Sequence, residues 1–434
     1  MSTVLLDSDV LEKIREKEVQ IYLSLQGLCG TKLSEIKDEL LKDLYNTYEI
    51  EGEGNLMESR RFYLQETVVR ILSDIVRDCE ERFANKERVR ETLQYLKTLK
   101  LPEQRSPEWY AMRENVLTAS SLADALGKGH FNTRESLLID KTSKEKKPFF
   151  TNDIIQWGVK YEPIATAFYE HSHNLTIVEF GLVPHPTFPI FGASPDGICD
   201  TDAPEPMIGR MLEIKCPPKR NFTDEVPEHY WMQMQGQLET CNLEECDFLQ
   251  VKLEEYANVD EYSQDTFVKD ETLQEGYASS GYPKGLVLTF ISRDADKNPV
   301  YAYEYCELFT SVTGCLEWRD NLLKRYSEEN IAYETFQENW WYIKRYECTL
   351  VLRDRGWWRT TMAKIIDFWE DVENYRKVGN QSLLDKRDER RSKRKITMGK
   401  NKKPKKNSPT NIIKINKEIV EAIATTNFLD TDSD

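Results

Sequence analysis

The stretch FGASPDGICD, residues 191–200, is followed after a turn-rich segment by MLEIKCP, residues 211–217. Each is a short apolar run that carries charged groups, Asp196 in the first and Glu213 with Lys215 in the second. Side chains alternate between the two faces of a strand, so Glu213 and Lys215 are predicted to share one face, about 7 Å apart. The apolar residues between them are predicted to face the opposite side.

Pairing of these two strands is expected to bring Asp196 alongside Glu213, because neighbouring strands lie about 4.8 Å apart. Two carboxylates beside a lysine make a site for a hard divalent cation, and Mg²⁺ keeps open positions for water and phosphate oxygens. Lys215 would then orient or deprotonate an attacking water, which suits hydrolysis of a phosphodiester. An acid–X–lysine triplet alone is more often a solvated strand face, and only the upstream SPDG makes the two interpretations comparable.

Composition limits the class of protein. The chain has 434 residues, 39% of them hydrophobic, and a formal net charge of −16. Its apolar runs fall short of the roughly 20 residues that a membrane span needs, so we expect an intracellular protein without a membrane partner. The nine cysteines include no CxxC pair, which argues against a disulfide framework or a zinc ribbon. The acidic balance requires any DNA contact to use a local basic surface.

The chain is predicted to have three parts. Residues 1–100 show apolar residues at helical spacing and are expected to form a helical domain. Residues 101–378 alternate helix and strand patterns, which predicts an α/β or α+β domain with a central sheet flanked by helices. Within it, the acidic, loop-rich residues 257–340 are interpreted as an insertion. Residues 379–434 are basic and polar at their start and are expected to be largely disordered.

Five blocks between residues 101 and 255 together resemble one known family. In chain order they are QRSPEWYAMRENVLTASSLADALG, WGVKYEPIA, FGASPDGI, LEIKCP and YWMQMQGQL. They resemble the YqaJ-type viral recombinase family, which includes the exonuclease of phage lambda. The resemblance implies a restriction-endonuclease-like PD-(D/E)xK fold, with a central mixed sheet, that degrades double-stranded DNA from its 5′ end with Mg²⁺. Mn²⁺ is the alternative ion, and two ions per site are expected.

The resemblance also implies roles for particular residues. Asp196, Glu213 and the backbone carbonyl of Ile214 match the metal ligands, and Glu162 of WGVKYEP matches a helix-borne glutamate that reaches the metal directly or through water. Lys215 matches the lysine that positions water. Gln233 matches an active-site glutamine, whereas Gln235 and Gln237 are interpreted as structural. Without the resemblance, Glu162 would be read as a solvated helix glutamate and the glutamines as a polar stripe.

A second set of residues matches the family's pocket for the 5′-terminal phosphate. Arg113 offers a planar charged fork, and Ser120 is predicted at the start of a helix, where backbone N–H groups attract an anion. Ser194 is expected to join them, with Lys219 or Arg220 supplying a further cation. From the residues alone, a surface ion pair for Arg113 and a plain helix cap for Ser120 would be preferred.

The function expected from these observations is a metal-dependent deoxyribonuclease that acts on double-stranded DNA ends and leaves 3′ overhangs for recombination. One alternative is an endonuclease or resolvase on the same fold, and another is a catalytically idle DNA-binding scaffold. A single-strand annealing protein is a candidate partner, and oligomerisation is open. If the chain is viral, the host nucleus or cytoplasm is its expected location. The basic tail is interpreted as a DNA tether or an import signal, with a merely solvated terminus as the alternative.

Overall fold

The structure is a computed structural model. It describes residues 17, 20–21, 24, 32–47, 58, 61–62, 64–69, 72–73, 76–77, 86–104, 106–143, 152–219, 222, 225–294 and 297–400, of which 86, 205 and 391–400 are described by their backbone alone. The chain divides into two compact units, residues 1–379 and residues 380–434.

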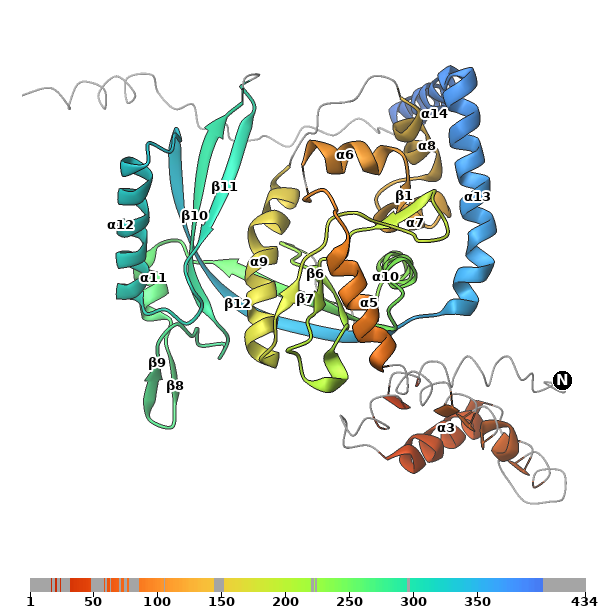
Figure 1. Cartoon of the computed structure of the whole chain (residues 1–434), viewed down its shortest axis with the longest axis horizontal. Helices are drawn as coiled ribbons and strands as arrows, with labels where there is room; N and C mark the ends of the chain where they lie inside the picture. Colours follow the sequence, from red (N-terminus) through yellow and green to blue (C-terminus); the bar gives the residue numbers. More distant parts are fainter. Residues whose placement is uncertain are drawn as a thin grey trace, which may run out of the picture. The chain divides into compact units, whose positions relative to one another are not determined.

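Several helices of the first unit, among them α9, α10 and α12, flank a central sheet (Figure 1). The helix bounds in this unit are α3 Leu33–Thr47, α5 Lys86–Thr98, α6 Pro107–Glu114, α7 Leu122–Ala125, α8 Arg134–Thr142, α9 Asp153–His173, α10 Glu228–Cys241, α11 Val259–Gln264, α12 Val312–Glu328 and α13 Arg355–Val378. Two 3₁₀ turns, η1 Ala119–Ser121 and η2 Glu205–Met207, complete them.

Seven strands form the central mixed sheet in the order β11-β10-β12-β7-β6-β5-β2. Their bounds are β2 Ile177–Val178, β5 Gly197–Cys199, β6 Met211–Lys215, β7 Glu245–Glu255, β10 Lys284–Arg293, β11 Pro299–Tyr305 and β12 Thr335–Leu352. Among the described strands of this seven-stranded sheet, β6 and β7 make the one parallel pair. A three-stranded sheet contains β1 Leu117–Thr118, β4 Phe191–Ala193 and β3 Val183–Pro184, and a hairpin contains β8 Phe267–Lys269 and β9 Thr272–Gln274. The predicted fold class, a central mixed sheet flanked by helices, is confirmed.

The two faces of the sheet are covered by different helices. Helix α9 packs on one face, where Tyr161 and Ala165 are buried against Leu212 and Ile214 of β6. Helix α10 covers the other face, where its apolar residues pack with Met211 and neighbours on β7. Figure 1 shows α9 and α10 on opposite sides of β6 and β7. Strand β6 therefore lies between two cores and is shielded from water on both faces.

Residues 257–340, interpreted from the sequence as an insertion, contribute strands to the same sheet. Strands β10 and β11 extend it at one edge, and the 18-residue β12 pairs first with β10 and then with β7. The register of β12 against β7 shifts between Ile343 and Arg345. Helices α11 and α12 cover this outer part with a separate hydrophobic cluster that includes Tyr262 and Trp340. The stretch interpreted as an insertion therefore shares the central sheet through β10, β11 and β12.

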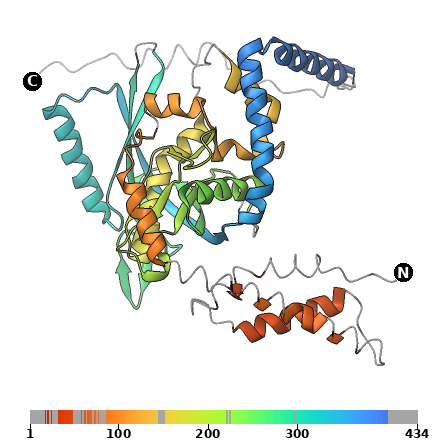
Figure 2. The ribbon, with the colours of Figure 1, turned by 45° about the vertical axis from the view of Figure 1, so that its right-hand side comes forward.

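Helix α5 is tied to the sheet domain by apolar and charged contacts. Leu93 and Leu96 are buried in the core cluster under α10, and Arg88 pairs with Glu244 at 2.5 Å. Earlier in the chain, α3 buries Ile36, Leu40 and other residues in a small cluster of its own. Figure 2 shows α13, in blue, beside α10, in green, and Trp357 of α13 contacts Trp231 of α10 with ring centroids 5.0 Å apart.

The second unit begins with a helix, α14 Gln381–Lys400, within the segment expected to be largely disordered. Its residues are mainly Lys, Arg, Glu, Gln and Leu, straight-chain types that lose little rotamer freedom in a helix. The Gln381 amide donates to Asp385 one turn further on at 2.8 Å. The rest of the predicted tail, residues 401–434, lies outside the described residues.

None of the described helices is both apolar enough and long enough to cross a membrane.

Candidate active site

The site is built around the hairpin of β5 and β6. In its antiparallel register Gly197 is opposite Leu212 and Ile198 is opposite Met211. Asp196 directly precedes β5, and its carboxylate accepts a hydrogen bond from the Ile214 N–H at 2.7 Å. The structure therefore places Asp196 against the middle of β6.

Strand β6 sends its side chains alternately to two environments. Leu212, Ile214 and Cys216 are buried in the cluster beneath α9. Glu213 and Lys215 lie on the other face, toward α10, and the Lys215 Nζ donates to a Glu213 oxygen. Glu213 is completely buried, whereas the Lys215 side chain retains 24% of its exposure. The carboxylate is therefore held in the interior, and its lysine partner is only partly exposed.

Two glutamines of α10 hold the Glu213 carboxylate. Gln233 donates to Glu213 Oε1 and Gln237 to Oε2, both at 2.7 Å. The two residues are four apart, so they lie on the same face of the helix. Gln235 points the other way, where it donates to the Leu352 carbonyl and accepts from the Asp354 N–H. Gln237 was interpreted as structural from the sequence; its i, i+4 relation to Gln233 is the signal that links it to Glu213.

Acidic side chains lie close together in the site, and they shift the pKa values of Asp196 and Lys215. Burial raises the pKa of Asp196, the nearby carboxylates of Glu213 and Glu162 raise it further, and Lys215 offsets part of this effect. Glu162 is half-buried on α9, so its carboxylate belongs to the same electrostatic group. Burial would lower the pKa of Lys215, but Glu213 and Asp196 outweigh it and the pKa is raised. Lys215 is therefore charged at neutral pH.

The donor set fits a hard cation bound by few protein ligands. Among the residues that the structure describes, no group of three or more His, Cys, Asp or Glu side chains is arranged to hold a metal ion. Mg²⁺, however, is commonly bound by one or two carboxylates together with waters and substrate phosphate oxygens. Burial first, and the neighbouring carboxylates after it, raise the pKa of Asp196 because they disfavour its charged form, and a bound cation would favour that form again. Asp196 and Glu213, with the Ile214 carbonyl and Glu162 as the further expected donors, thus suit such an ion.

The residues predicted to bind the 5′ phosphate lie in one connected group. Arg113 donates to the Ser120 hydroxyl at 3.2 Å, and its guanidinium lies 4.3 Å from the centre of the Trp109 ring. The Trp109 indole N–H donates to the Ser194 hydroxyl at 3.2 Å, which connects this group to the segment that carries Asp196. Ser120 lies within η1 and its side chain caps no helix. Trp109, which the sequence analysis did not single out, joins the three predicted residues.

Positive charge accumulates behind this group. Lys141 of α8 donates to the backbone carbonyls of Arg113 and Val116, and Arg376 of α13 donates to those of Lys141 and Glu114. Burial, with the neighbouring Arg113 and Arg376, lowers the pKa of Lys141 to about 8. Within the described part of the chain, Arg113 forms no ion pair with a carboxylate. The group thus gathers three partly buried or exposed cations, and the carboxylates of Glu114 and Asp140 offset part of the charge around Lys141.

The remaining predicted cations are not assigned to this group. Lys219 is exposed in the turn after β6, and Arg220 lies outside the described residues.

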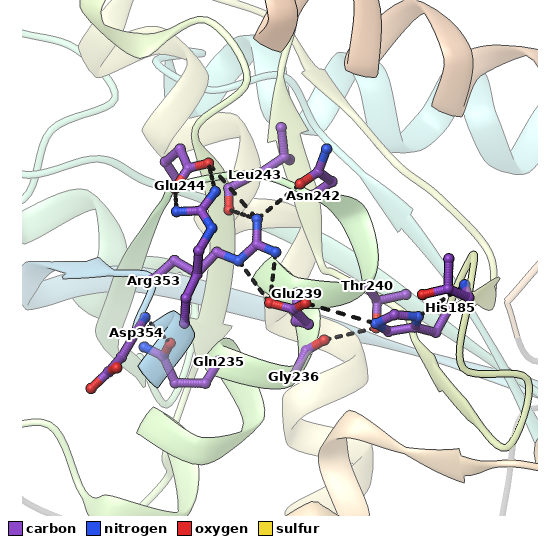
Figure 3. A network of polar contacts seen from close by, with 12 residues as sticks. His185, Gln235, Gly236, Glu239, Thr240, Asn242, Leu243, Glu244, Arg353 and Asp354 are labelled. Carbon is purple, nitrogen blue, oxygen red and sulfur yellow. Dashed lines mark hydrogen bonds and ion pairs between the residues drawn. The ribbon is translucent and has the colours of Figure 1, made fainter. Parts of the chain in front are cut away.

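A buried polar network fixes the helix that carries the glutamines (Figure 3). Arg353, at the end of β12, donates to Glu239 of α10 at 2.6 and 2.9 Å and to Asn242 at 3.0 Å. His185 lies 4.0 Å from Glu239 on its other side and stacks on Trp358 of α13. The C-terminal end of α10 is therefore clamped between β12 and α13, which sets the position of Gln233 and Gln237.

Comparison with known proteins finds a similarity over the part of the chain that contains this site. Residues 108–244 match the sequence profile of the YqaJ-like viral recombinase domain. This range includes the hairpin, both glutamines and the cationic group. The resemblance predicted from the five sequence blocks is therefore confirmed. The description of the matched family, a viral recombinase domain, is the one that the blocks indicated.

Individual relatives are distant. An uncharacterized protein of Acanthamoeba polyphaga mimivirus is 28% identical over 313 residues, 68% of this chain and 56% of the mimivirus protein. A protein of African swine fever virus is 25% identical over 159 residues, 32% of this chain and 46% of that protein. The chain thus spans about half the length of these curated relatives. Among solved structures, an alkaline exonuclease from Laribacter hongkongensis is similar with a TM-score of 0.37 and 19% identity, over 64% of this chain and 99% of that one.

Proposed function

We propose that this chain, with its YqaJ-like viral recombinase domain over residues 108–244, is a metal-dependent deoxyribonuclease that degrades double-stranded DNA from its 5′ ends. The observation that carries the proposal is the convergence of Asp196, Glu213 and Lys215 on the face of β6 that α10 covers. The buried acids repel one another, which an unused site has no reason to maintain. The products would be 3′ overhangs suited to recombination, with a single-strand annealing protein as the candidate partner.

The residues of the site have separable roles. A bound Mg²⁺, or Mn²⁺, would polarise the phosphodiester and lower the pKa of its water. Asp196, Glu213 and the Ile214 carbonyl are the proposed ligands, assisted by Glu162, and two ions could share them. Lys215, held in its charged form, donates hydrogen bonds and so orients the attacking water or a phosphate oxygen; a charged ammonium group is no base.

Glutamine contacts keep Glu213 in its working orientation. Gln233 and Gln237 donate to opposite oxygens of the same carboxylate. Hydrogen bonds to an ionised acceptor are stronger than neutral ones. They favour the ionised carboxylate and restrict its rotation, so that its position is fixed before substrate arrives.

End recognition is proposed for the cationic group of Arg113, Ser120 and Ser194, with Trp109 beneath the guanidinium. The planar guanidinium suits a terminal phosphate monoester, and the hydroxyls can donate to its oxygens. Recognition of that phosphate would give degradation its 5′-to-3′ direction. An endonuclease has no need of such a group, which is why we prefer the exonuclease to a resolvase.

The proposal is tested by incubating end-labelled linear duplex and closed circular duplex with the full chain, with Mg²⁺ or with EDTA. We expect digestion of the linear DNA alone, from 5′-phosphorylated ends, and only with the metal. The variant Lys215→Ala should lose digestion at least 100-fold. Cutting of the circle would indicate the endonuclease, and binding of DNA without digestion by the wild type would indicate the idle scaffold.

A further inference from the structure

We infer that an aromatic surface near the candidate active site, formed by the exposed His130 and Phe131 on the partly buried His229 and called here the aromatic shelf, stacks an unpaired nucleobase of the DNA. The inference rests on the proposed function, because it assumes that nucleic acid enters this site. It adds a binding subsite that neither the sequence blocks nor the predicted phosphate group includes.

The three rings form one compact arrangement. The imidazoles of His130 and His229 are stacked, with centroids 5.1 Å apart and planes inclined by 12°. The Phe131 ring meets both edge-on, at 4.7 and 5.9 Å. Phe131 is 74% exposed, the highest fraction among the exposed large hydrophobic side chains of the described residues. The ring is thus supported on one side by aromatic partners and open to solvent on the other.

The loop that presents Phe131 is held from both ends. Gly127 begins it with φ +74°, a conformation that favours glycine. The Asp124 carboxylate accepts hydrogen bonds from the side chain and the backbone of Asn132. Thr133 then caps α8 by accepting from the Ser136 N–H at 3.2 Å. The exposure of Phe131 therefore belongs to a loop with a defined shape.

The loop is also tied to the start of α10. Lys128 forms an ion pair with Glu228, the first residue of that helix, and the stacked His130 and His229 make a second connection. Helix α10 carries Gln233, which holds Glu213. The shelf is consequently fixed to the same element that orders the active site.

A short aromatic path joins the shelf to Lys215. The ring of His229 lies 4.1 Å from that of Tyr230, and the Lys215 Nζ lies 5.2 Å from the centre of the Tyr230 ring. A nucleotide whose phosphate reaches Lys215 therefore has its neighbours close to the shelf. Every base has a π-face, so an exposed aromatic ring stacks bases without sequence preference.

The test measures binding apart from cleavage. The probes are a fluorescein-labelled duplex with a three-nucleotide single-stranded end, and the same duplex with abasic residues in that end. Anisotropy titrations of the full chain are made in EDTA, where no hydrolysis is expected. Stacking on an aromatic ring contributes enough for Phe131→Ala to weaken binding of the base-containing probe by about tenfold. Phe131→Trp should retain it, and the abasic probe should bind the wild type and Phe131→Ala equally.

Phe62→Ala is the matched control, because Phe62 is likewise an exposed phenylalanine, at 65%, and lies outside residues 108–244. It should leave both titrations unchanged. If Phe131→Ala keeps the wild-type ratio of affinities for the two probes, the inference is overturned. A second outcome also overturns it: Phe131→Ala changes the sedimentation coefficient of the chain but not the ratio of affinities for the two probes. The Phe131 ring would then hold copies of the chain together and would not stack a base.

Failure of the nuclease proposal is distinguishable from failure of the shelf. A wild-type chain that binds the base-containing probe more tightly than the abasic one, but never digests DNA with Mg²⁺, rejects the nuclease alone. A chain that digests DNA while Phe131→Ala binds both probes as the wild type does rejects the shelf alone.

Discussion

Glu213 is the residue on which the candidate site depends most, because it is fully buried and accepts from three side-chain donors. Burying a carboxylate is costly unless hydrogen bonds and an opposite charge compensate. Lys215 supplies the charge, and Gln233 and Gln237 supply the neutral donors. Each of these partners is therefore expected to matter for stability as well as for chemistry.

Gln237→Ala tests one of these donors. It leaves the Glu213 Oε2 without its 2.7 Å partner, and an unsatisfied buried acceptor costs about 1–3 kcal/mol. We expect a lower free energy of unfolding by urea and a loss of nuclease activity of at least tenfold. In a Glu213→Gln background the same substitution should cost measurably less, because the buried charge is gone. Equal costs in both backgrounds would show that Gln237 acts independently of Glu213.

Asp196→Asn separates chemistry from folding. The substitution removes a buried like charge beside Glu213 and keeps an oxygen that can accept from the Ile214 N–H. In EDTA we expect the melting temperature to rise by a few degrees, while Mg²⁺-dependent digestion is lost. Calorimetry and the end-labelled assay check the two effects. A fall in the melting temperature would mean that the carboxylate is compensated within the protein and has no need of a cation.

Some of these residues were predictable and others were not. Asp196, Glu213 and Lys215 follow from strand alternation and one hairpin, which are local rules. Trp109 and Lys141 reach the cationic group through contacts with residues distant in the sequence, such as the Trp109 bond to Ser194. No spacing rule along the chain encodes such contacts. Their roles emerge only when the helices are packed.

At the scale of elements, the packing of α10 explains a glycine within a helix. A Cβ at Gly236 would lie 2.9 Å from the Phe191 ring and 3.2 Å from Ala119. Alanine would favour the helix by about 1 kcal/mol, but crowding a packed core costs about 1–3 kcal/mol. We therefore expect Gly236→Ala to lower the free energy of unfolding and to reduce activity by shifting the glutamines.

Gly158→Ala in α9 is the matched control, since a Cβ there meets no atom within 4 Å. Helix propensity alone then applies, so this variant should be more stable by up to about 1 kcal/mol. Urea unfolding of both variants provides the comparison. A stabilising Gly236→Ala would show that α10 can move away from β4 without cost.

Lys141 of α8, which donates to the Arg113 carbonyl of α6, predicts that the free energy of unfolding depends on pH. Lys141 has a pKa near 8 in the folded protein and the usual higher value in the unfolded chain. Between these values the unfolded state binds more protons, so the Lys141 contribution to stability rises with pH. The free energy of unfolding of the wild type should therefore increase relative to Lys141→Met between pH 8 and pH 10. A difference that is constant over this range would show that Lys141 titrates normally.

Element prediction succeeded where the hydrophobic pattern was regular. The strand over β7 and the helix over α10 lie where their apolar residues place them. The membership of β10 and β11 in the main sheet was not predicted, because the pairing of β10 with β12 joins residues some fifty positions apart. Helix α14 was missed because its charged residues, read together, suggested a solvated coil.

At the scale of the whole molecule, the basic segment after residue 379 is proposed to tether DNA. Deletion of residues 380–434 removes clusters such as RRSKRK from a chain whose net charge is −16. We expect weaker binding of duplex DNA and a shallower dependence of the binding constant on salt, because fewer counterions are released. The melting temperature of residues 1–379 should not change. An unaltered salt dependence would reject the tether and leave nuclear import or a merely solvated terminus.

Strand β12 belongs to two cores at once: it contributes Trp341 and Ile343 to the cluster under α9, and Trp340 to the cluster under α11 and α12. Neighbouring side chains of one ribbon thus anchor separate hydrophobic interiors. If one hydrophobic cluster unfolds, β12 loses part of its packing, and the other cluster loses the support of the same strand. The part of the chain around α11 and α12 and the part that holds the candidate active site should consequently unfold in a single cooperative transition. Calorimetry should show one peak for both.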